Sequence, residues 1–205
     1  MLKINSALHQ ISGGEKVIDS AFDSGYNSLS GFSHAFRNTT GSTPSDSAEI
    51  NIINIMRFTT PLGPMTACAT EKGIYLLDFS DRKNLDDELE YLKKTLHAKI
   101  IFGQNQYLDM LKEQIDEYFS GTRKIFDLPL HTPGTDFQNL VWKKLIDIPY
   151  GEHRSYVGKA NGSNRIAIII PCHRIIGESG KLTGYAGGLW RKQWLLDFER
   201  KNSSL

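Results

Sequence analysis

The segment "IIIPCHRII", residues 168–176, constrains the fold of this chain more than any other. Its five isoleucines predict a buried strand, yet the same segment carries a proline, a cysteine, a histidine and an arginine. Because proline lacks a backbone N–H, we expect Pro171 to end the strand and to leave Cys172 at its exit, a frequent place for nucleophiles. The pattern predicts either a nucleophilic cysteine or a structural cysteine beside a hydrogen-bonded histidine.

The neighbouring histidine is the reason to consider chemistry. A neutral thiol is a poor nucleophile, and His173 could activate Cys172 by taking its proton. Adjacent side chains of an extended strand point to opposite faces, so this cooperation requires a bend. A carboxylate can orient the imidazole, and Glu199 is the candidate because its helix carries apolar residues that can dock on the core. Those residues are Trp190, Trp194, Leu195 and Phe198.

The size and composition of the chain fit a globular protein of one or two domains. Of its 205 residues, 40% are hydrophobic and 23% are charged. No apolar run reaches the length of a membrane span, and the start of the chain lacks the pattern of a signal peptide. We therefore expect a cytoplasmic protein that makes no membrane contact and is a monomer.

The two cysteines, Cys68 and Cys172, are too few for a disulfide scaffold and form no CxxC motif. The sequence therefore predicts no metal site. Cys68 lies within a strand-like run, where a free cysteine usually behaves as a small hydrophobe, and we assign no chemistry to it.

The charge is unevenly distributed along the chain. Residues 1–50 carry three basic and five acidic side chains, a net charge of −2. Residues 151–205 carry nine basic and four acidic side chains, a net charge of +5. The basic end is a candidate surface for a polyanion such as DNA, and a solvated surface helix is the alternative.

Residues 15–45 predict two short helices across a glycine turn, which together form a helix-turn-helix. The first helix is expected to end at Gly25, since glycine favours the position after a helix C-terminus. Ser28 or Ser30 can cap the second helix. The apolar stripe expected on the first helix consists of Val17, Ile18, Ala21 and Phe22.

This segment resembles the second helix-turn-helix of AraC-type regulators, in the order "GY-x-S-x-S-x-F-x-x-AF-R" followed by "G-x-TP". The resemblance implies that the second helix reads DNA. The contacts it implies are Ser28, Ser30, His34 and Arg37. The alternative is a small helical lid without DNA contact, because this part of the chain is net acidic.

The middle of the chain predicts a mixed α and β lobe. Strand-like runs alternate with turn signals over residues 53–80, and amphipathic helices follow over 84–98 and 105–121. Cys68 falls in the second of these strands. A further helix is expected after Gly134, with Phe137, Val141, Trp142 and Leu145 on one face.

Three blocks carry a second and closer resemblance. They are "FQ-x-x-VW-x-x-L-x-x-IPYGE-x-x-SY", "PCHRII" and "GYAGGLWRKQWLLDFE", in that order. From about residue 54 to residue 199, the chain closely resembles the methylated-DNA–protein-cysteine methyltransferases, which are O6-alkylguanine-DNA alkyltransferases. With the preceding helices, it resembles a shortened Ada-type adaptive-response protein.

The resemblance implies an α+β fold in three parts. A partial AraC-type helix-turn-helix would occupy residues 1–47. A small ribonuclease H-like α/β lobe would occupy residues 52–131. A mostly helical, winged-helix-like catalytic domain that binds DNA would occupy residues 132–205.

It also implies a role for each site residue. Cys172 would accept the alkyl group, His173 would act as its general base through a water, and Glu199 would orient His173. Arg174 would hold structure. The residues implied to bind the substrate are Tyr156, Asn164, Ile175, Tyr185 and Ala186.

The reaction implied is a single-turnover transfer of a methyl or larger alkyl group from O6-alkylguanine, and from O4-alkylthymine, in double-stranded DNA. The alkylated base must be turned out of the stack to reach the sulfur. The product is a stable S-alkylcysteine, and the step requires no metal and no cofactor.

The chain departs from the family between Tyr156 and Val157, where we expect about 15 residues of the family's pattern to have no counterpart. The family has a helix-turn-helix with an arginine finger here, whereas "VGKANGSN", residues 157–164, cannot form two helices and a turn. Lys159 and Arg165 are the basic residues left as DNA contacts. The alternatives are a lesion-binding or vestigial relative without efficient base flipping, an Ada-like transcriptional regulator, or a cysteine hydrolase.

Overall fold

The computed structural model describes residues 2–47, 50–155 and 163–203. The protein has a mixed α+β fold whose backbone separates into two compact units. One unit joins residues 1–55 with 89–105, and the other joins residues 56–88 with 106–205. The domain boundaries expected from the sequence stay a prediction.

The first unit begins with the α-helices α1 (Leu2–Ser12), α2 (Val17–Asp23) and α3 (Leu29–Thr40), followed by the short η1 (Ser45–Ser47). The two helices expected from the sequence are confirmed, whereas α1 was not expected. Ser28 caps α3 by accepting a hydrogen bond from the backbone N–H of Gly31 at 3.2 Å. Gly25, with φ of 77°, forms the turn between α2 and α3.

The apolar stripe expected on α2 is only partly buried. Ala21 packs in a cluster with α1 and α3, but the side chains of Ile18 and Phe22 are 44% and 54% exposed. The expectation for these two residues is wrong because α2 has only seven residues and packs just its Ala21 side against its neighbours. The cluster consists of Ile4, Ala7, Leu8, Ile11, Ala21, Phe32 and Phe36.

A strand pair belongs to the same unit as these helices. The start of β1 (Asn51–Thr60) pairs in parallel with β4 (Ala98–Phe102), from Asn51 opposite Ala98 to Ile55 opposite Phe102. Ile52 and Ile101 pack on the helical cluster, so the helices and the strands share one hydrophobic core.

Polar contacts reinforce this attachment. The Lys99 ammonium donates to the Thr40 carbonyl and to Ser42 Oγ, each at 2.6 Å, and so satisfies a carbonyl in the last turn of α3. The Asn5 amide donates to the Phe102 carbonyl at 2.8 Å. The N-terminal helices are therefore attached to β4 by contacts from α1 and from the end of α3 and the residues after it.

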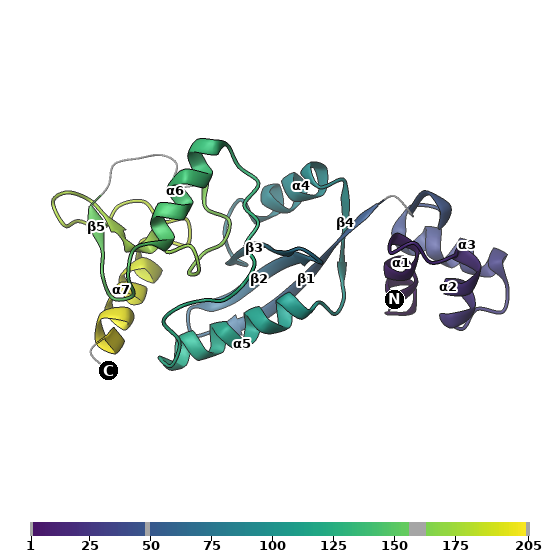
Figure 1. The fold of residues 1–205 in the computed structure, drawn as a ribbon, viewed down its shortest axis with the longest axis horizontal. Helices are drawn as coiled ribbons and strands as arrows, with labels where there is room; N and C mark the ends of the chain where they lie inside the picture. The colour runs from purple at the N-terminus through teal and green to yellow at the C-terminus, as the bar shows by residue number, and fades with distance from the viewer. Residues whose placement is uncertain (1, 48–49, 156–162, 204–205) are drawn as a thin grey trace. The chain divides into compact units, whose positions relative to one another are not determined.

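The four-stranded sheet has the order β3-β2-β1-β4. The antiparallel hairpin β2 (Gly63–Thr70) and β3 (Gly73–Phe79) confirms the expected strands, with Met65 opposite Phe79. The expected helices are α4 (Leu85–Thr95) and α5 (Gln106–Ser120), and α5 packs on β2 and β3 (Figure 1). Cys68 is buried in β2, and this burial raises its pKa to about 12. Its burial is what was expected of a cysteine that behaves as a small hydrophobe.

The C-terminal part of the second unit carries α6 (Asp136–Ile146) and α7 (Leu189–Ser203). A short parallel pair, β5 (Arg154–Ser155) and β6 (Ile175–Ile176), lies in the same part of the chain. Trp190, which was expected to dock on the core, is instead 59% exposed, and Phe137, expected on one face with Trp142 and Leu145, is 62% exposed. Each lies in the first turn of its helix, where the buried stripe of Trp142 and Leu145, or of Leu195, has not yet begun.

The strand expected at residues 166–170 is absent from the described structure, and that expectation is wrong. Ile166 forms a single bridge with Leu77 of β3, after which the chain folds into consecutive turns. The Leu77 N–H donates to the Arg165 carbonyl at 2.9 Å, and the Ala167 N–H donates to the Leu77 carbonyl at 2.7 Å. The isoleucines are buried because this turn packs in the core, not because it belongs to a sheet.

Within the ranges that the structure describes, no helix is both long and apolar enough to cross a membrane.

Candidate active site

The buried side chain of Asn164 holds the turn in place of a strand partner. Its Oδ1 accepts from the backbone N–H of Ile166 at 3.0 Å. Its Nδ2 lies 3.3 Å from the Ile166 carbonyl, 2.9 Å from the Ile170 carbonyl and 3.1 Å from Cys172 Sγ. One amide therefore fixes both the backbone of the turn and the sulfur at its end.

A short 3₁₀ turn, η3 (Cys172–Arg174), follows directly. The Cys172 N–H donates to the Ile170 carbonyl at 2.8 Å, and the Ile175 N–H donates to the Cys172 carbonyl. This turn supplies the bend that cooperation between Cys172 and His173 requires. Both side chains are buried, with 7% of Cys172 exposed.

His173 and Arg174 both bind the buried carboxylate of Glu199 on α7. His173 Nε2 lies 2.9 Å from Glu199 Oε1. Arg174 forms a bidentate pair, with Nε donating to Oε2 at 2.8 Å and Nη2 donating to Oε1 at 2.9 Å. The other ring nitrogen, His173 Nδ1, is buried and has no hydrogen-bond partner among the described residues. It is the nitrogen available to receive a proton.

The charges set the resting protonation state of the site. Burial raises the pKa of Cys172 to about 11, although the Asn164 amide and the nearby Lys192 act in the opposite direction. Burial lowers the pKa of His173, against the pull of Glu199. Burial alone would raise the pKa of Glu199, but His173 and Arg174 hold it well below its usual range. The resting site therefore combines a neutral thiol, a neutral imidazole and a carboxylate, the arrangement that general-base catalysis requires.

The structure brings part of the expected substrate-binding set to this site. The Tyr185 ring packs edge-on to the His173 ring with 6.4 Å between centroids, and its hydroxyl is buried without a partner among the described residues. Ile175 is buried and follows the cysteine turn, whereas Ala186 is exposed. Tyr156, like Lys159, lies outside the described residues.

Arg165 is held by protein partners beside the active-site turn. Its Nε pairs with Glu88, and its Nη1 donates to the Pro133 carbonyl at 3.1 Å. These contacts fix the start of the turn. A DNA contact by Arg165 stays a prediction.

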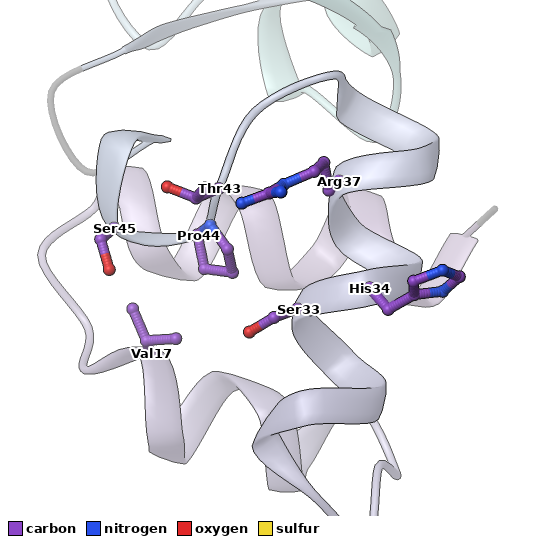
Figure 2. Close-up of a pocket in the computed structure, with 7 residues that line it drawn as sticks. All are labelled: Val17, Ser33, His34, Arg37, Thr43, Pro44 and Ser45. Carbon is purple, nitrogen blue, oxygen red and sulfur yellow. The ribbon is translucent and has the colours of Figure 1, made fainter.

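The residues expected to read DNA lie on and beside α3. Ser28 caps the helix, with Ser30 Oγ 3.5 Å from its hydroxyl oxygen, and both residues are exposed. A cavity of about 360 Å³ lies beside the helix, lined by Val17, Ser33, His34, Arg37, Thr43, Pro44 and Ser45. Figure 2 shows that the Arg37 side chain extends toward Thr43 and Pro44, whereas His34 points away.

Two site residues were not found from the sequence. Tyr118 donates a hydrogen bond to Glu199 Oε1 at 2.8 Å, and the buried Lys192 donates to the Thr183 carbonyl at 2.6 Å. The periodicity of α5 places Tyr118 on the buried face with Leu111 and Ile115. A buried tyrosine hydroxyl usually has a hydrogen-bond partner, so the position of Tyr118 on the apolar face was the sequence signal for such a contact.

Fold and site together define a class of protein, one with a buried cysteine followed directly by a histidine that contacts a buried glutamate. Comparison with models of known protein families identifies this class. The model for the ribonuclease-like domain of 6-O-methylguanine DNA methyltransferase matches residues 57–132, and the model for the DNA binding domain of that protein matches residues 156–201.

Individual relatives agree. A methylated-DNA–protein-cysteine methyltransferase of Methanosarcina barkeri is 41% identical over 158 residues, covering 69% of this chain and 94% of the relative. An inducible methyltransferase of the same name from Bacillus subtilis is 36% identical, covering 66% of this chain and 84% of the relative. The chain belongs to the methylated-DNA–protein-cysteine methyltransferase family.

Solved structures show the same fold. The crystal structure of Mycobacterium tuberculosis O6-methylguanine methyltransferase aligns with a TM-score of 0.62 at 37% identity, over 73% of this chain and 94% of that one. A structure of M. tuberculosis OGT in complex with DNA aligns with a TM-score of 0.61 at 37% identity, over 74% of this chain and 94% of that one.

The raised pKa of Cys172 predicts how its reactivity depends on pH. In a Cys68→Ala background, the rate of alkylation by iodoacetamide should still be rising at about pH 10, because only the thiolate reacts and burial suppresses it. In denaturant, the rate should level off near the ordinary thiol pKa of 9.0. A plateau at neutral pH in the folded protein would show a thiolate at rest and contradict this description.

Proposed function

We propose that this chain repairs DNA by taking an alkyl group from O6-alkylguanine onto Cys172 Sγ, once per protein molecule. The observation that carries the proposal is a pair of contacts, Asn164 with Cys172 and the adjacent His173 with Glu199, within a chain of this family. O4-alkylthymine presents the same alkyl–oxygen bond and is the second substrate. Double-stranded DNA containing the alkylated base is the partner.

The chemistry follows from the protonation state of the site. The base must leave the stack, since the sulfur lies in a buried turn. Sγ bonds to the alkyl carbon as the carbon–oxygen bond breaks, with its electron pair going to the guanine oxygen. The thiol proton passes through a water to His173 Nδ1, and the departing guanine takes up a proton. The thioether is uncharged and stable, so the protein is consumed.

The remaining residues serve the base and the imidazole. Tyr185, Ile175 and Ala186 line the guanine pocket. Tyr156 donates to the guanine as it leaves. Glu199 holds His173 in the orientation that leaves Nδ1 toward the thiol, and it stabilises the imidazolium that forms.

Substitution of the acceptor gives the first test. Cys172→Ser should abolish methyl uptake from methylated duplex DNA, measured by mass spectrometry as one added methyl on the peptide containing residue 172, while Cys68→Ser should retain it. His173→Ala should slow transfer by about 10²–10⁴-fold, the usual contribution of a general base, and Glu199→Ala should slow it less. Methyl uptake by Cys172→Ser would mean that another residue is the acceptor.

A second candidate retains the chemistry but extrudes bases from duplex DNA inefficiently. The alignment with the M. barkeri relative spans 158 residues, whereas 69% of 205 residues is about 141, so about 17 positions of the relative have no counterpart here. The sequence predicts this deficit in the short stretch between Tyr156 and Asn164. Such a loss would remove groove and phosphate contacts worth about 1–3 kcal/mol each.

Substrates of increasing demand separate the two candidates. If extrusion is impaired, Cys172 should react with free O6-benzylguanine and with alkylated single strands, and much more slowly with the same lesion in a duplex. The matched measurement is the rate of S-alkylation with each substrate at one salt concentration. Faster reaction with the duplex than with the single strand would favour full repair activity and reject the second candidate.

A third candidate is Ada-like regulation through α2 and α3. It is favoured by the helix-turn-helix geometry and by the exposed Arg37 beside a cavity. This candidate requires the N-terminal helices to bind DNA that carries no lesion.

A gel-shift assay in a Cys172→Ser background tests it. Arg37→Ala should weaken binding to unmodified duplex DNA several-fold and reduce its salt dependence, because a phosphate contact is lost. Lys16→Ala, which removes an exposed cation before α2, is the control and should bind as the parent does. Equal binding by parent and Arg37→Ala would rule out a DNA contact by this residue.

A further inference from the structure

Tyr118 contacts the active site from α5, which is separate from the turn that carries Cys172 and from the helix α7 that carries Glu199. Its side chain is wholly buried among aromatic rings. The rings packed on it are those of Phe119, Phe126, Tyr150 and Phe198, with centroids 5.3–5.9 Å away. Tyr118 falls in the segment that matches the ribonuclease-like domain, whereas Glu199 falls in the segment that matches the DNA binding domain. One hydrogen bond of 2.8 Å therefore joins the two family domains at the catalytic carboxylate.

The oxygen that accepts this bond is the one that holds His173. Glu199 Oε1 accepts from Tyr118 at 2.8 Å, and it lies 2.9 Å from both His173 Nε2 and Arg174 Nη2. Oε2 accepts from Arg174 Nε at 2.8 Å and from the Gly151 N–H at 3.3 Å. Five contacts saturate a carboxylate that has about four lone-pair positions. The donors on Oε1 thus compete for the same negative charge.

This competition bears on the strength of the base. A carboxylate raises the proton affinity of an imidazole that it binds, and other donors to the same oxygen weaken that effect. His173 must be unprotonated to take the thiol proton. A carboxylate that stabilised the imidazolium too strongly would leave His173 already protonated and unable to act as the base. We propose that Tyr118 is a positioning residue: its hydrogen bond to Glu199 weakens the stabilisation that this carboxylate gives to protonated His173. The proposal rests on the proposed role of His173 as base.

The other groups around the imidazole stay the same when only this hydroxyl is removed. Those facing His173 are Cys172 and Arg174 of η3, Glu199 and Lys192 of α7, and Tyr185 from the loop before α7. Tyr150 also lies near Glu199, but its buried hydroxyl has no partner among the described residues. Tyr118→Phe keeps the ring and its packing, and Tyr150→Phe is the matched control that removes a hydroxyl without removing a hydrogen bond to Glu199.

The test is the pH dependence of S-alkylation by free O6-benzylguanine. Since transfer requires neutral His173, its rate falls as the pH drops through the pKa of His173. Tyr118→Phe should move this acid limb to higher pH by roughly 0.5–1 unit, which corresponds to the net free energy of about one ordinary hydrogen bond, and leave the alkaline rate within about twofold. Tyr150→Phe should leave the limb in place. A rate lowered equally at every pH would indicate a structural role and overturn the proposal.

NMR titration of His173, assigned by comparison with His173→Ala, makes the test independent of transfer. Its midpoint should rise in Tyr118→Phe by the same amount as the acid limb, and an unchanged midpoint would also overturn the proposal. If the unaltered protein transfers no alkyl group at any pH, the proposed function fails. The NMR midpoint then still decides whether Tyr118 tunes His173.

Discussion

The buried carboxylate of Glu199 is the interaction on which the site depends. It neutralises Arg174, holds His173 and accepts from Tyr118 and Gly151, so residues from three other segments of the chain meet at its two oxygen atoms. A buried charge of this kind is costly unless it is fully paired, and removing one partner from such a pair typically costs about 3–5 kcal/mol. The same saturation that makes the carboxylate tolerable in the core also fixes which nitrogen of His173 is left for chemistry.

A second constraint places the sulfur. The Asn164 amide closes the isoleucine-rich turn and reaches Cys172, while Leu77 of β3 holds the start of that turn through backbone hydrogen bonds on both sides. The sheet is thereby connected to Cys172 through hydrogen bonds and not through side-chain packing alone. Burial raises the pKa of this thiol to about 11, so the proposed reaction requires a group that accepts its proton.

Several errors of sequence interpretation have the same physical origin. The run at residues 166–170 is apolar enough for a strand, but its hydrogen bonds go to a side chain and to its own backbone instead of a sheet. Ile18, Phe22, Phe137 and Trp190 fit helical stripes and yet are exposed, because periodicity gives the face of a helix but not how much of it a neighbour covers. The sequence located the N-terminal helices α2 and α3. Their attachment to β4 through Lys99 could not be predicted, because that strand lies some sixty residues later in the chain.

The sequence by itself determined the local structure and the chemistry at stake. Periodicity and turn residues located the helices α2 to α6 and the β2–β3 hairpin. The order Cys172–His173 with a distant Glu199 predicted a nucleophile, its base and an orienting group, and the structure brings His173 into contact with Glu199. The tertiary structure alone decided the protonation states, the turn around Asn164, the pairing of Arg165 with Glu88 and the arrival of Tyr118 at Glu199. The reason is physical: burial and hydrogen bonds between segments far apart in the chain set these properties, and no local pattern records which segments will meet.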